Sequence, residues 1–310
     1  MLRASLLWLS EQPRVFRFVR NNRLAGRLAS RFVAGETIDT AMAVLRGLNA
    51  AHISASLDLL GESVNRAEDA RAARDVYLQL LDRIHSAGAE ANVSVKLTQM
   101  GLDIDESLCL ENMRAILARA RQYGSFVRID MEGSAYTQRT LDFFTRTVHP
   151  EFGNTAGVVL QSYLRRTAAD VEAMIALGAR VRLCKGAYKE PADIAFPDKR
   201  DVDANYVSCL ERLLEHGTYP GIATHDERII THARAFAKGR RIDPSRYEFQ
   251  MLYGVRRDLQ HELRAAGCGM RVYVPFGSHW YPYLMRRLAE RPANIGFILG
   301  NVVRESLRRR

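Results

Sequence analysis

Long apolar runs are missing from this sequence. No uninterrupted stretch approaches the ~18 to 20 residues that a bilayer-spanning helix needs, so an integral membrane protein is excluded, although peripheral attachment is not. Cysteine is also scarce, and there is no signal peptide: Cys109, Cys184, Cys209 and Cys268 are widely spaced and form no CxxC pair. We therefore expect the chain in a reducing compartment.

Several motifs that would identify an active site are absent as well. The eight histidines form no HExxH, so a metal site has little sequence support. There is no GxGxxG after a strand, no GxxxxGK followed by Ser or Thr, and no GxSxG. A Rossmann nucleotide site, a P-loop and a nucleophile elbow are therefore unsupported.

Apolar material, by contrast, is plentiful. The chain has 310 residues, of which 47% are hydrophobic and 26% charged, which indicates a folded globular protein. At ~150 residues per domain the length suggests two domains, but a single α/β barrel commonly takes ~250 residues. One barrel with an appendage is thus an open interpretation.

Positive charge gathers at the two ends of the chain. Lys and Arg exceed Asp and Glu by 45 to 35, and residues 1–35 hold seven arginines against the single acid Glu11. This pattern is typical of a basic amphipathic arm. It fits a solvated helix face, attraction to anionic lipid or nucleic acid, or a transit peptide. Because the stretch continues without a clear processing site into ordinary helical sequence, we take it as part of the mature fold.

Short β-type runs alternate with longer helical stretches from about residue 50 onward. Eight repeats of strand then helix predict a (β/α)8 barrel, with a doubly wound open sheet as the alternative. The expected strands are 53–60, 93–97, 126–131, 157–161, 181–184, 221–224, 247–252 and 271–274. The expected helices are 67–87, 106–123, 137–147, 167–177, 202–216, 227–238, 255–265 and 279–290.

The carboxyl ends of these strands are unusually polar. Side chains alternate faces along a strand, and the charged residues keep to one alternation while the opposite one is apolar. Unpaired buried charge is costly, so this polar interior predicts internal pairing or a pocket for a polar ligand. The strand-end residues are Glu62, Lys96, Asp130, Gln161, Arg182 with Lys185, His225, Gln250 and Tyr273.

The last expected helix carries a pair of arginines. Tyr283, Arg286, Arg287 and Glu290 are related by steps of three and four residues, so they share one helix face. Two adjacent guanidinium groups can hold a carboxylate.

Nine segments in order resemble the proline dehydrogenase family in its monofunctional bacterial form. They are LDLLGE (57–62), SVKLTQ (94–99), RIDMEG (128–133), VVLQSYL (158–164), VRLCKGAYKEP (181–191), ATHD (223–226), EFQMLYGVR (248–256), YVPFG (273–277) and WYPYLMRRLAER (280–291). The resemblance covers most of residues 36–300 and implies a distorted (β/α)8 barrel. We expect residues 1–50 to form a basic helical arm and 51–310 to form the catalytic domain. The resemblance implies noncovalent FAD and oxidation of L-proline to Δ1-pyrroline-5-carboxylate, with hydride passing from proline C5 to flavin N5. Electrons would then pass to a membrane quinone. From the basic arm and the arginines near the carboxyl end, we expect a cytoplasmic protein with peripheral contact at the inner face of the cytoplasmic membrane.

The resemblance also implies roles for individual residues. Asp130 and Arg182 would be catalytic, and Glu62 would be a gate that pairs with Arg286. For the cofactor, it implies Met131, Gln161, Arg182, Lys185, Gly186, Ala187, Thr224 and His225. For the substrate, it implies a carboxylate clamp of Arg286 and Arg287, together with Lys96, Leu252, Tyr273, Tyr283 and Glu290.

Two other functions stay open on the residues alone. A lysine at a strand end, Lys96 or Lys185, also suits a Schiff-base aldolase. The basic ends could mark a nucleic-acid-binding protein, although no aromatic interleaving or binding motif accompanies them and the polar strand ends would go unexplained. We expect no nucleic acid partner and no metal.

Overall fold

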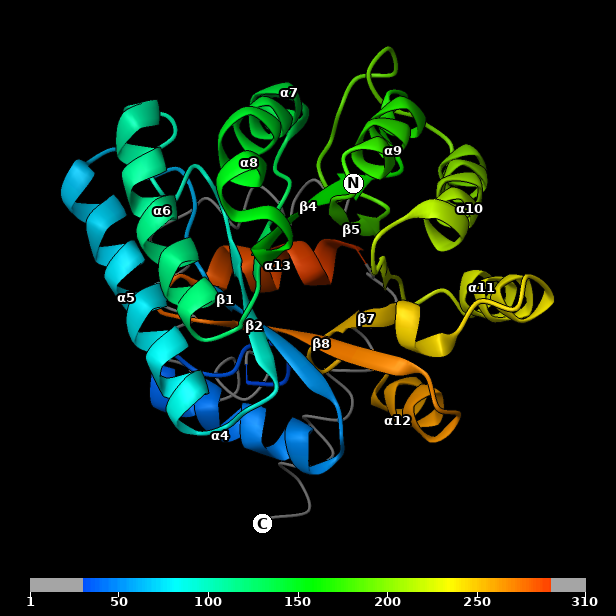
Figure 1. Cartoon of the computed structure of the whole chain (residues 1–310), viewed down its shortest axis with the longest axis horizontal. Coiled ribbons are helices and arrows are strands. Elements are labelled where there is room, and N and C mark those ends of the chain that lie inside the picture. The colour runs from blue at the N-terminus through cyan, green and yellow to red at the C-terminus, as the bar shows by residue number, and fades with distance from the viewer. Residues whose placement is uncertain (1–29, 291–310) are drawn as a thin grey trace.

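A computed structural model describes residues 30–290, with the side chains of 286–290 excluded. Within this range eight parallel strands close into a barrel in chain order, which confirms the expected (β/α)8 class (Figure 1). The strands are β1 (Ser54–Leu59), β2 (Ala91–Val95), β3 (Val127–Ile129), β4 (Ala156–Gln161), β5 (Arg180–Cys184), β6 (Gly221–Ala223), β7 (Glu248–Leu252) and β8 (Gly269–Phe276).

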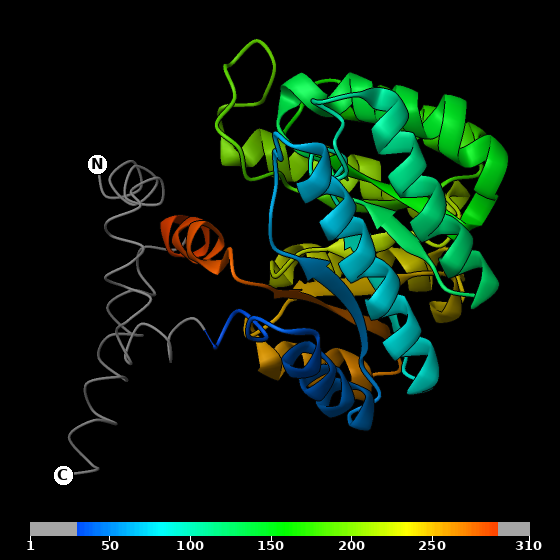
Figure 2. The ribbon, with the colours of Figure 1, turned by 90° about the vertical axis from the view of Figure 1, so that its left-hand side faces the viewer.

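Helices cover the outside of the barrel. They are α4 (Ile38–Ala50), α5 (Ala67–Ser86), α6 (Glu106–Gln122), α7 (Ser134–Phe143), α8 (His149–Phe152), α9 (Thr167–Ala176), α10 (Lys199–His216), α11 (Glu227–Gly239), α12 (Arg257–Ala265) and α13 (Trp280–Glu290). In Figure 1, α5 packs beside α6 on one flank, while α9, α10 and α11 follow one another on the other. Figure 2 shows α13 lying across the end of the barrel toward which β8 runs.

The strand pattern explains where the core forms. The strand residues whose side chains point outward are apolar and are fully buried against the helices, as at Val93, Val95, Val127 and Ile129. Hydrophobic burial at ~25 cal/mol per Å² makes this outer layer the main stabilising contact between sheet and helices. The polar side chains of the alternate strand positions point inward and are also buried, inside the barrel. The hydroxyls of Ser56 and Ser94, on the neighbouring strands β1 and β2, are for example 3.0 Å apart there.

One expected helix differs from the structure. The stretch 137–147 begins earlier, as α7, and then widens into a π-helix (Phe144–Val148) that runs directly into α8. Phe144 is fully buried in this turn. Apolar periodicity cannot reveal the change in winding, because a single π turn shifts the helix face without altering the composition.

Helix α4 packs against β1 and β8, and its Ala41, Met42 and Leu45 belong to the main hydrophobic core. The Thr37 hydroxyl accepts from the Thr40 backbone and caps its first turn. The division between arm and catalytic domain at residue 50 stays a prediction, and residues 1–29 of the basic arm lie outside the described part. Within the described residues, no helix is both long and apolar enough to cross a membrane.

Candidate active site

Arg182 lies at the centre of the barrel interior. Its guanidinium donates from Nη1 to Asp130 Oδ1 (2.7 Å) and Ser94 Oγ (3.2 Å), from Nη2 to Ser56 Oγ (3.3 Å), and from Nε to Gln250 Oε1 (2.5 Å). Its side chain is 7% exposed, and that of Asp130 is 12% exposed. Three strands (β1, β2 and β7) and the end of β3 thus supply four acceptors for the five N–H groups of one cation, a geometry that stabilises a planar guanidinium.

Asp130 joins this arginine to a tyrosine. Its second oxygen accepts a hydrogen bond from the Tyr273 hydroxyl (2.8 Å), and the Arg182 guanidinium carbon lies 5.2 Å from the centre of the Tyr273 ring. Burial and the nearby Asp130 charge raise the pKa of Tyr273 well above its ordinary value. The phenol therefore stays protonated and donates to the carboxylate.

A second ion pair lies beside this group. Lys96 Nζ donates to Asp58 Oδ1 at 2.8 Å, and the Asp58 side chain is only 1% exposed. Asp58 and Ser94 are neighbours in the register of β1 and β2, so Lys96, one residue beyond β2, reaches the same layer. Burial lowers the pKa of Lys96, but the Asp58 charge and other neighbours outweigh burial and raise it. The amine is held as an ammonium.

A second layer of polar side chains lies inside the barrel nearer the amino-terminal ends of the strands. Glu248 Oε1 accepts from Arg271 Nε (2.7 Å) and Gln250 Nε2 (2.6 Å), and Glu248 Oε2 accepts from the Tyr219 hydroxyl (3.2 Å). Arg128 is buried here, with its Nη1 bonded to the Val158 carbonyl at 3.0 Å. The alternation of side chains along a strand directs Glu248 and Arg128 to the barrel interior, but it does not reveal which groups they contact.

The ends of β3, β4 and β6 supply four of the residues expected to bind the cofactor, Met131, Gln161, Thr224 and His225. Gln161 Nε2 donates to the Met131 carbonyl (3.3 Å), while its Oε1 is buried without a hydrogen-bond partner among the described residues. The Leu252 amide donates to His225 Nε2 at 3.0 Å. Thr224 and Met131 are 5% and 6% exposed. A buried acceptor without a donor is costly, so this edge of the barrel is suited to a ligand that carries an N–H group.

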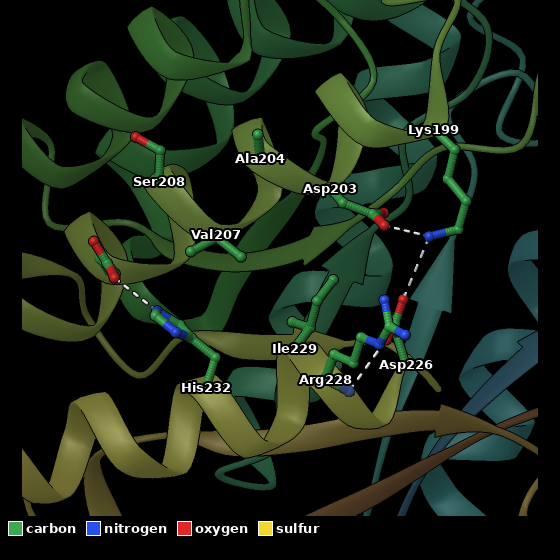
Figure 3. A pocket seen from close by; sticks show the side chains of 10 residues that line it. Lys199, Asp203, Ala204, Val207, Ser208, Asp226, Arg228, Ile229 and His232 are labelled. Atoms are coloured by element: carbon green, nitrogen blue, oxygen red, sulfur yellow. Dashed lines mark hydrogen bonds and ion pairs between the residues drawn. The ribbon is translucent and has the colours of Figure 1, made fainter.

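Lys185 lies between two carboxylates rather than free at the strand end. Its Nζ is 2.5 Å from Asp203 Oδ1 and 2.9 Å from Asp226 Oδ2, and Lys199 pairs with the same two acids. Lys199, Asp203 and Asp226 lie at one end of a cavity of about 700 Å³ between α10 and α11, beside Lys185. Figure 3 shows Lys199, Asp203, Asp226 and Arg228 grouped at that end, with Ser208 and His232 at the other. Sequence analysis did not find this cavity, since its walls come from helix faces.

Gly186 requires a backbone that other residues rarely adopt. Its φ is +103°, and a Cβ there would lie 2.2 Å from the Tyr163 ring. The loop that follows is tied to α7, because Glu190 Oε1 accepts from the Ser134 amide at 2.8 Å. Gly186 thus lies where the chain passes closely over Tyr163, and the next residue, Ala187, is exposed.

The last helix carries the remaining expected substrate residues. Arg286, Arg287 and Glu290 belong to α13, but their side chains lie outside the described part. Tyr283 is 7% exposed and packs in a small cluster with Phe32 and Leu60. Leu252 and Glu62 are half-buried, and the expected pairing of Glu62 with Arg286 stays a prediction.

Among the described side chains no group of three or more His, Cys, Asp or Glu is arranged to hold a metal ion.

Comparison with known proteins gives concordant results. The family model described as proline dehydrogenase matches residues 41–299. A Deinococcus radiodurans protein named proline dehydrogenase is 41% identical over 308 residues, covering 98% of each chain. Proline dehydrogenase 1 of Bacillus subtilis (strain 168) is 40% identical, covering 98% of this chain and all of that one. The structure of proline utilization A from Bdellovibrio bacteriovorus, inactivated by N-propargylglycine, superposes with a TM-score of 0.82 at 26% identity. It covers 93% of this chain, which spans 38% of that longer protein.

Proposed function

The chain belongs to the proline dehydrogenase family and is an oxidoreductase that acts on proline, and on this premise we propose how its barrel carries out the reaction. We assign the chemistry to the interior group of Arg182, Asp130, Tyr273 and Lys96. The observation that carries the assignment is the buried Arg182–Asp130 pair at 2.7 Å, with the Lys96 ammonium paired to Asp58 beside it. Such preorganised cations stabilise the negative charge that develops on the electron acceptor as proline is oxidised.

We propose FAD as the cofactor, held by Met131, Gln161, Arg182, Lys185, Gly186, Ala187, Thr224 and His225. The residues fit the group in two ways. The orphaned Gln161 Oε1 offers an acceptor for a flavin ring N–H. Lys185, Lys199 and Arg228, beside the 700 Å³ cavity, offer cations to phosphates, and the carboxylates between them offer acceptors to hydroxyl or amino groups. When bound, FAD supplies the acceptor for the two electrons lost from proline.

The chain's own residues have separate tasks in this scheme. Arg286 and Arg287 of α13 hold the substrate carboxylate, with Glu62 as gate and Glu290 on the same helix face. Tyr273, Tyr283 and Leu252 pack on the pyrrolidine ring, and Lys96 adds positive charge on the substrate side. Substrate must react as the neutral amine, because the nitrogen lone pair has to be free. Asp130 orients Arg182, while α13 lies across the end of the barrel (Figure 2), where it would limit the access of water to the bound substrate.

The lysine chemistry of an aldolase has no support. A Schiff-base nucleophile must be a neutral amine, whereas the raised pKa of Lys96 holds it as an ammonium paired with Asp58. Lys185 forms ion pairs with Asp203 and Asp226. Neither the comparisons nor the described residues support a nucleic-acid-binding protein.

The visible spectrum of the purified protein tests this function. We expect an oxidised-flavin band near ~450 nm that bleaches on anaerobic addition of L-proline. Addition of D-proline is the matched control and should leave the band unchanged within the same period. Flavin that does not bleach would reject proline as substrate. A colourless protein that cannot be reconstituted with FAD would reject the cofactor.

We further propose that electrons pass to a membrane quinone and that the basic arm holds this cytoplasmic enzyme at anionic lipid. The support is the seven arginines of residues 1–35 and the basic residues 304 and 308–310 at the carboxyl end. Co-sedimentation with phosphatidylglycerol vesicles should be strong at low salt and weaken as salt rises, because surface attraction is screened. Neutral phosphatidylcholine vesicles serve as the control. Absence of binding to anionic vesicles at low salt would reject the membrane contact.

A further inference from the structure

A row of hydrogen-bonded side chains links the lower layer of the barrel to Arg182. Arg271 Nε and Gln250 Nε2 both donate to Glu248 Oε1, at 2.7 and 2.6 Å, and Arg182 Nε donates to Gln250 Oε1 at 2.5 Å. Glu248 and Gln250 are each 4% exposed. Water therefore cannot replace a missing partner in this row at low cost.

The two ends of the row fix the direction of its hydrogen bonds. Burial raises the pKa of Glu248, but the charge of Arg271 and the hydrogen bonds from Arg271 and Gln250 outweigh burial and lower it. Glu248 is thus a carboxylate that only accepts, and Arg182 is a guanidinium that only donates. Between them, the Gln250 amide has to turn its NH2 group to Glu248 and its carbonyl to Arg182. The opposite orientation would bring two donors together at Arg182 and two acceptors together at Glu248.

Strand β6 leaves room for this amide. A Cβ at Gly221 would lie 2.4 Å from Gln250 Nε2, so the glycine allows the amide to lie against the β6 backbone. Glycine within a strand commonly marks such a close approach. The position of the amide is therefore set by the barrel wall, and its orientation is set by Glu248.

The Gln250 carbonyl affects the contact between Arg182 and Asp130 because of the shape of the guanidinium group. The group is planar and rigid, so an acceptor at Nε fixes the direction in which Nη1 points. With Gln250 in place, Nη1 points to Asp130 Oδ1 at 2.7 Å. Without that acceptor, the guanidinium can turn about its own axis between the weaker hydroxyl contacts.

We infer that Glu248 is a positioning residue for the reaction, acting through Gln250 to hold the Arg182 guanidinium in line with Asp130. The inference rests on the role proposed above for Arg182. Glu248 has no need to touch the substrate, because its effect passes through the amide of Gln250.

Three variants of the holoenzyme separate this role from simple burial of charge. Glu248→Met removes the acceptor, while Glu248→Gln can keep a carbonyl toward Gln250 and Arg271. Tyr219→Phe is the matched control, because it removes a bond to the other oxygen, Glu248 Oε2. Glu248→Met should lower kcat about tenfold or more, with KM for proline within about twofold, since a hydrogen bond to a charged group is lost. Glu248→Gln should restore kcat to within about threefold, and Tyr219→Phe should leave it unchanged.

Gln250→Leu keeps the test decisive if Glu248→Met, which leaves Arg271 without its counter-ion, fails to fold. It removes the acceptor for Arg182 but leaves the Glu248–Arg271 pair intact, and it should reproduce the loss in kcat. A readout independent of activity is the hydrogen exchange of the Arg182 Nε–H, assigned by its absence in Arg182→Lys. Exchange should accelerate at least about tenfold in Gln250→Leu and stay slow in Tyr219→Phe.

The outcomes distinguish this inference from the proposed function. If L-proline does not reduce the wild-type flavin, the proposed function fails. If wild type is reduced but Gln250→Leu keeps the wild-type kcat and slow Nε–H exchange, only the positioning role fails. The positioning role also fails if Tyr219→Phe lowers kcat as much as Glu248→Met, because the Oε1 branch would then have no special part.

Discussion

Replacing Asp130 by Asn removes one negative charge from the barrel interior with almost no change in shape. Asp130 accepts from Arg182 at 2.7 Å and from Tyr273 at 2.8 Å, with side-chain exposures of 7% for Arg182 and 12% for Asp130. Breaking a buried ion pair costs about 3 to 5 kcal/mol. We expect the lower end, about 3 kcal/mol, because Gln250 and the serine hydroxyls still accept from Arg182. At ~2 °C per kcal/mol, Tm should fall by about 6 °C.

The same substitution should lower activity more than a stability loss would explain. A hydrogen bond to a charged group contributes about 1.5 to 3 kcal/mol, which corresponds to about 10- to 150-fold in kcat/KM. The assay is steady-state oxidation of L-proline well below Tm, with FAD content measured for each preparation. A variant with full flavin content and kcat/KM within twofold of wild type would refute the role given to Asp130.

A matched control exists on the surface of the same molecule. Asp82 accepts from Arg119 and from the Tyr123 hydroxyl (2.8 Å), the same three residue types as the interior group. The Asp82 and Arg119 side chains are 42% and 32% exposed, so water screens their charges. Asp82→Asn should change the free energy of unfolding by less than about 1 kcal/mol and leave kcat/KM unchanged.

Three further results are expected. Arg286→Met and Arg287→Met should each raise KM for proline well over tenfold, through loss of roughly 1.5 to 3 kcal/mol of charged hydrogen bonding; an unchanged KM in both would remove the clamp. Gly186→Ala should lower the free energy of unfolding, measured by chemical denaturation, by about 1 to 3 kcal/mol, because the φ of Gly186 is +103° and the added carbon would meet the Tyr163 ring. Gly88→Ala is the control: Gly88 has φ +57° in open space, so its replacement should lower the free energy of unfolding by less. Because the folded pKa of Glu248 is lowered, its stabilising contribution is present above its unfolded pKa of ~4.3 and lost as pH falls through the folded value. Glu248→Gln should therefore lose less stability than wild type between about pH 5 and pH 3, and equal losses would contradict the lowered pKa.

The barrel could be predicted because its pattern is local. Each strand alternates apolar and polar positions, so Val93 and Val95 point to the helices while Ser94 points inward, whatever the other strands do. The strand-end residues Asp130 and Arg182 followed from the same rule. The position of a residue in the alternation along its strand determines whether its side chain points inward or outward, and Ser94, Asp130 and Arg182 all follow this rule.

Partners within the barrel could not be predicted in the same way. Lys96 meets Asp58, 38 residues earlier, because the register of β1 against β2 sets Asp58 beside Ser94. A different shear would have given Lys96 another neighbour from the same sequence. Lys185 shows the same limit, since it meets Asp203 of α10 and Asp226 at the N-cap of α11, and the orientation of these helices depends on packing. The roles assigned by family resemblance stay predictions until the variants are measured.

Closure of the barrel has a consequence for how the protein is made. Strand β1 pairs with β8, and Arg271 Nη1 donates to the Ala55 carbonyl, 216 residues away in the chain. During synthesis at about 5 to 20 residues per second, β1 emerges early and its outer edge waits at least ~10 s for its partner. An uncovered strand edge is a template for pairing with other chains throughout that interval. The ribosome must therefore deliver almost the entire polypeptide before β8 can cover the free edge of β1, so this edge is the part of the nascent chain most open to pairing with other chains.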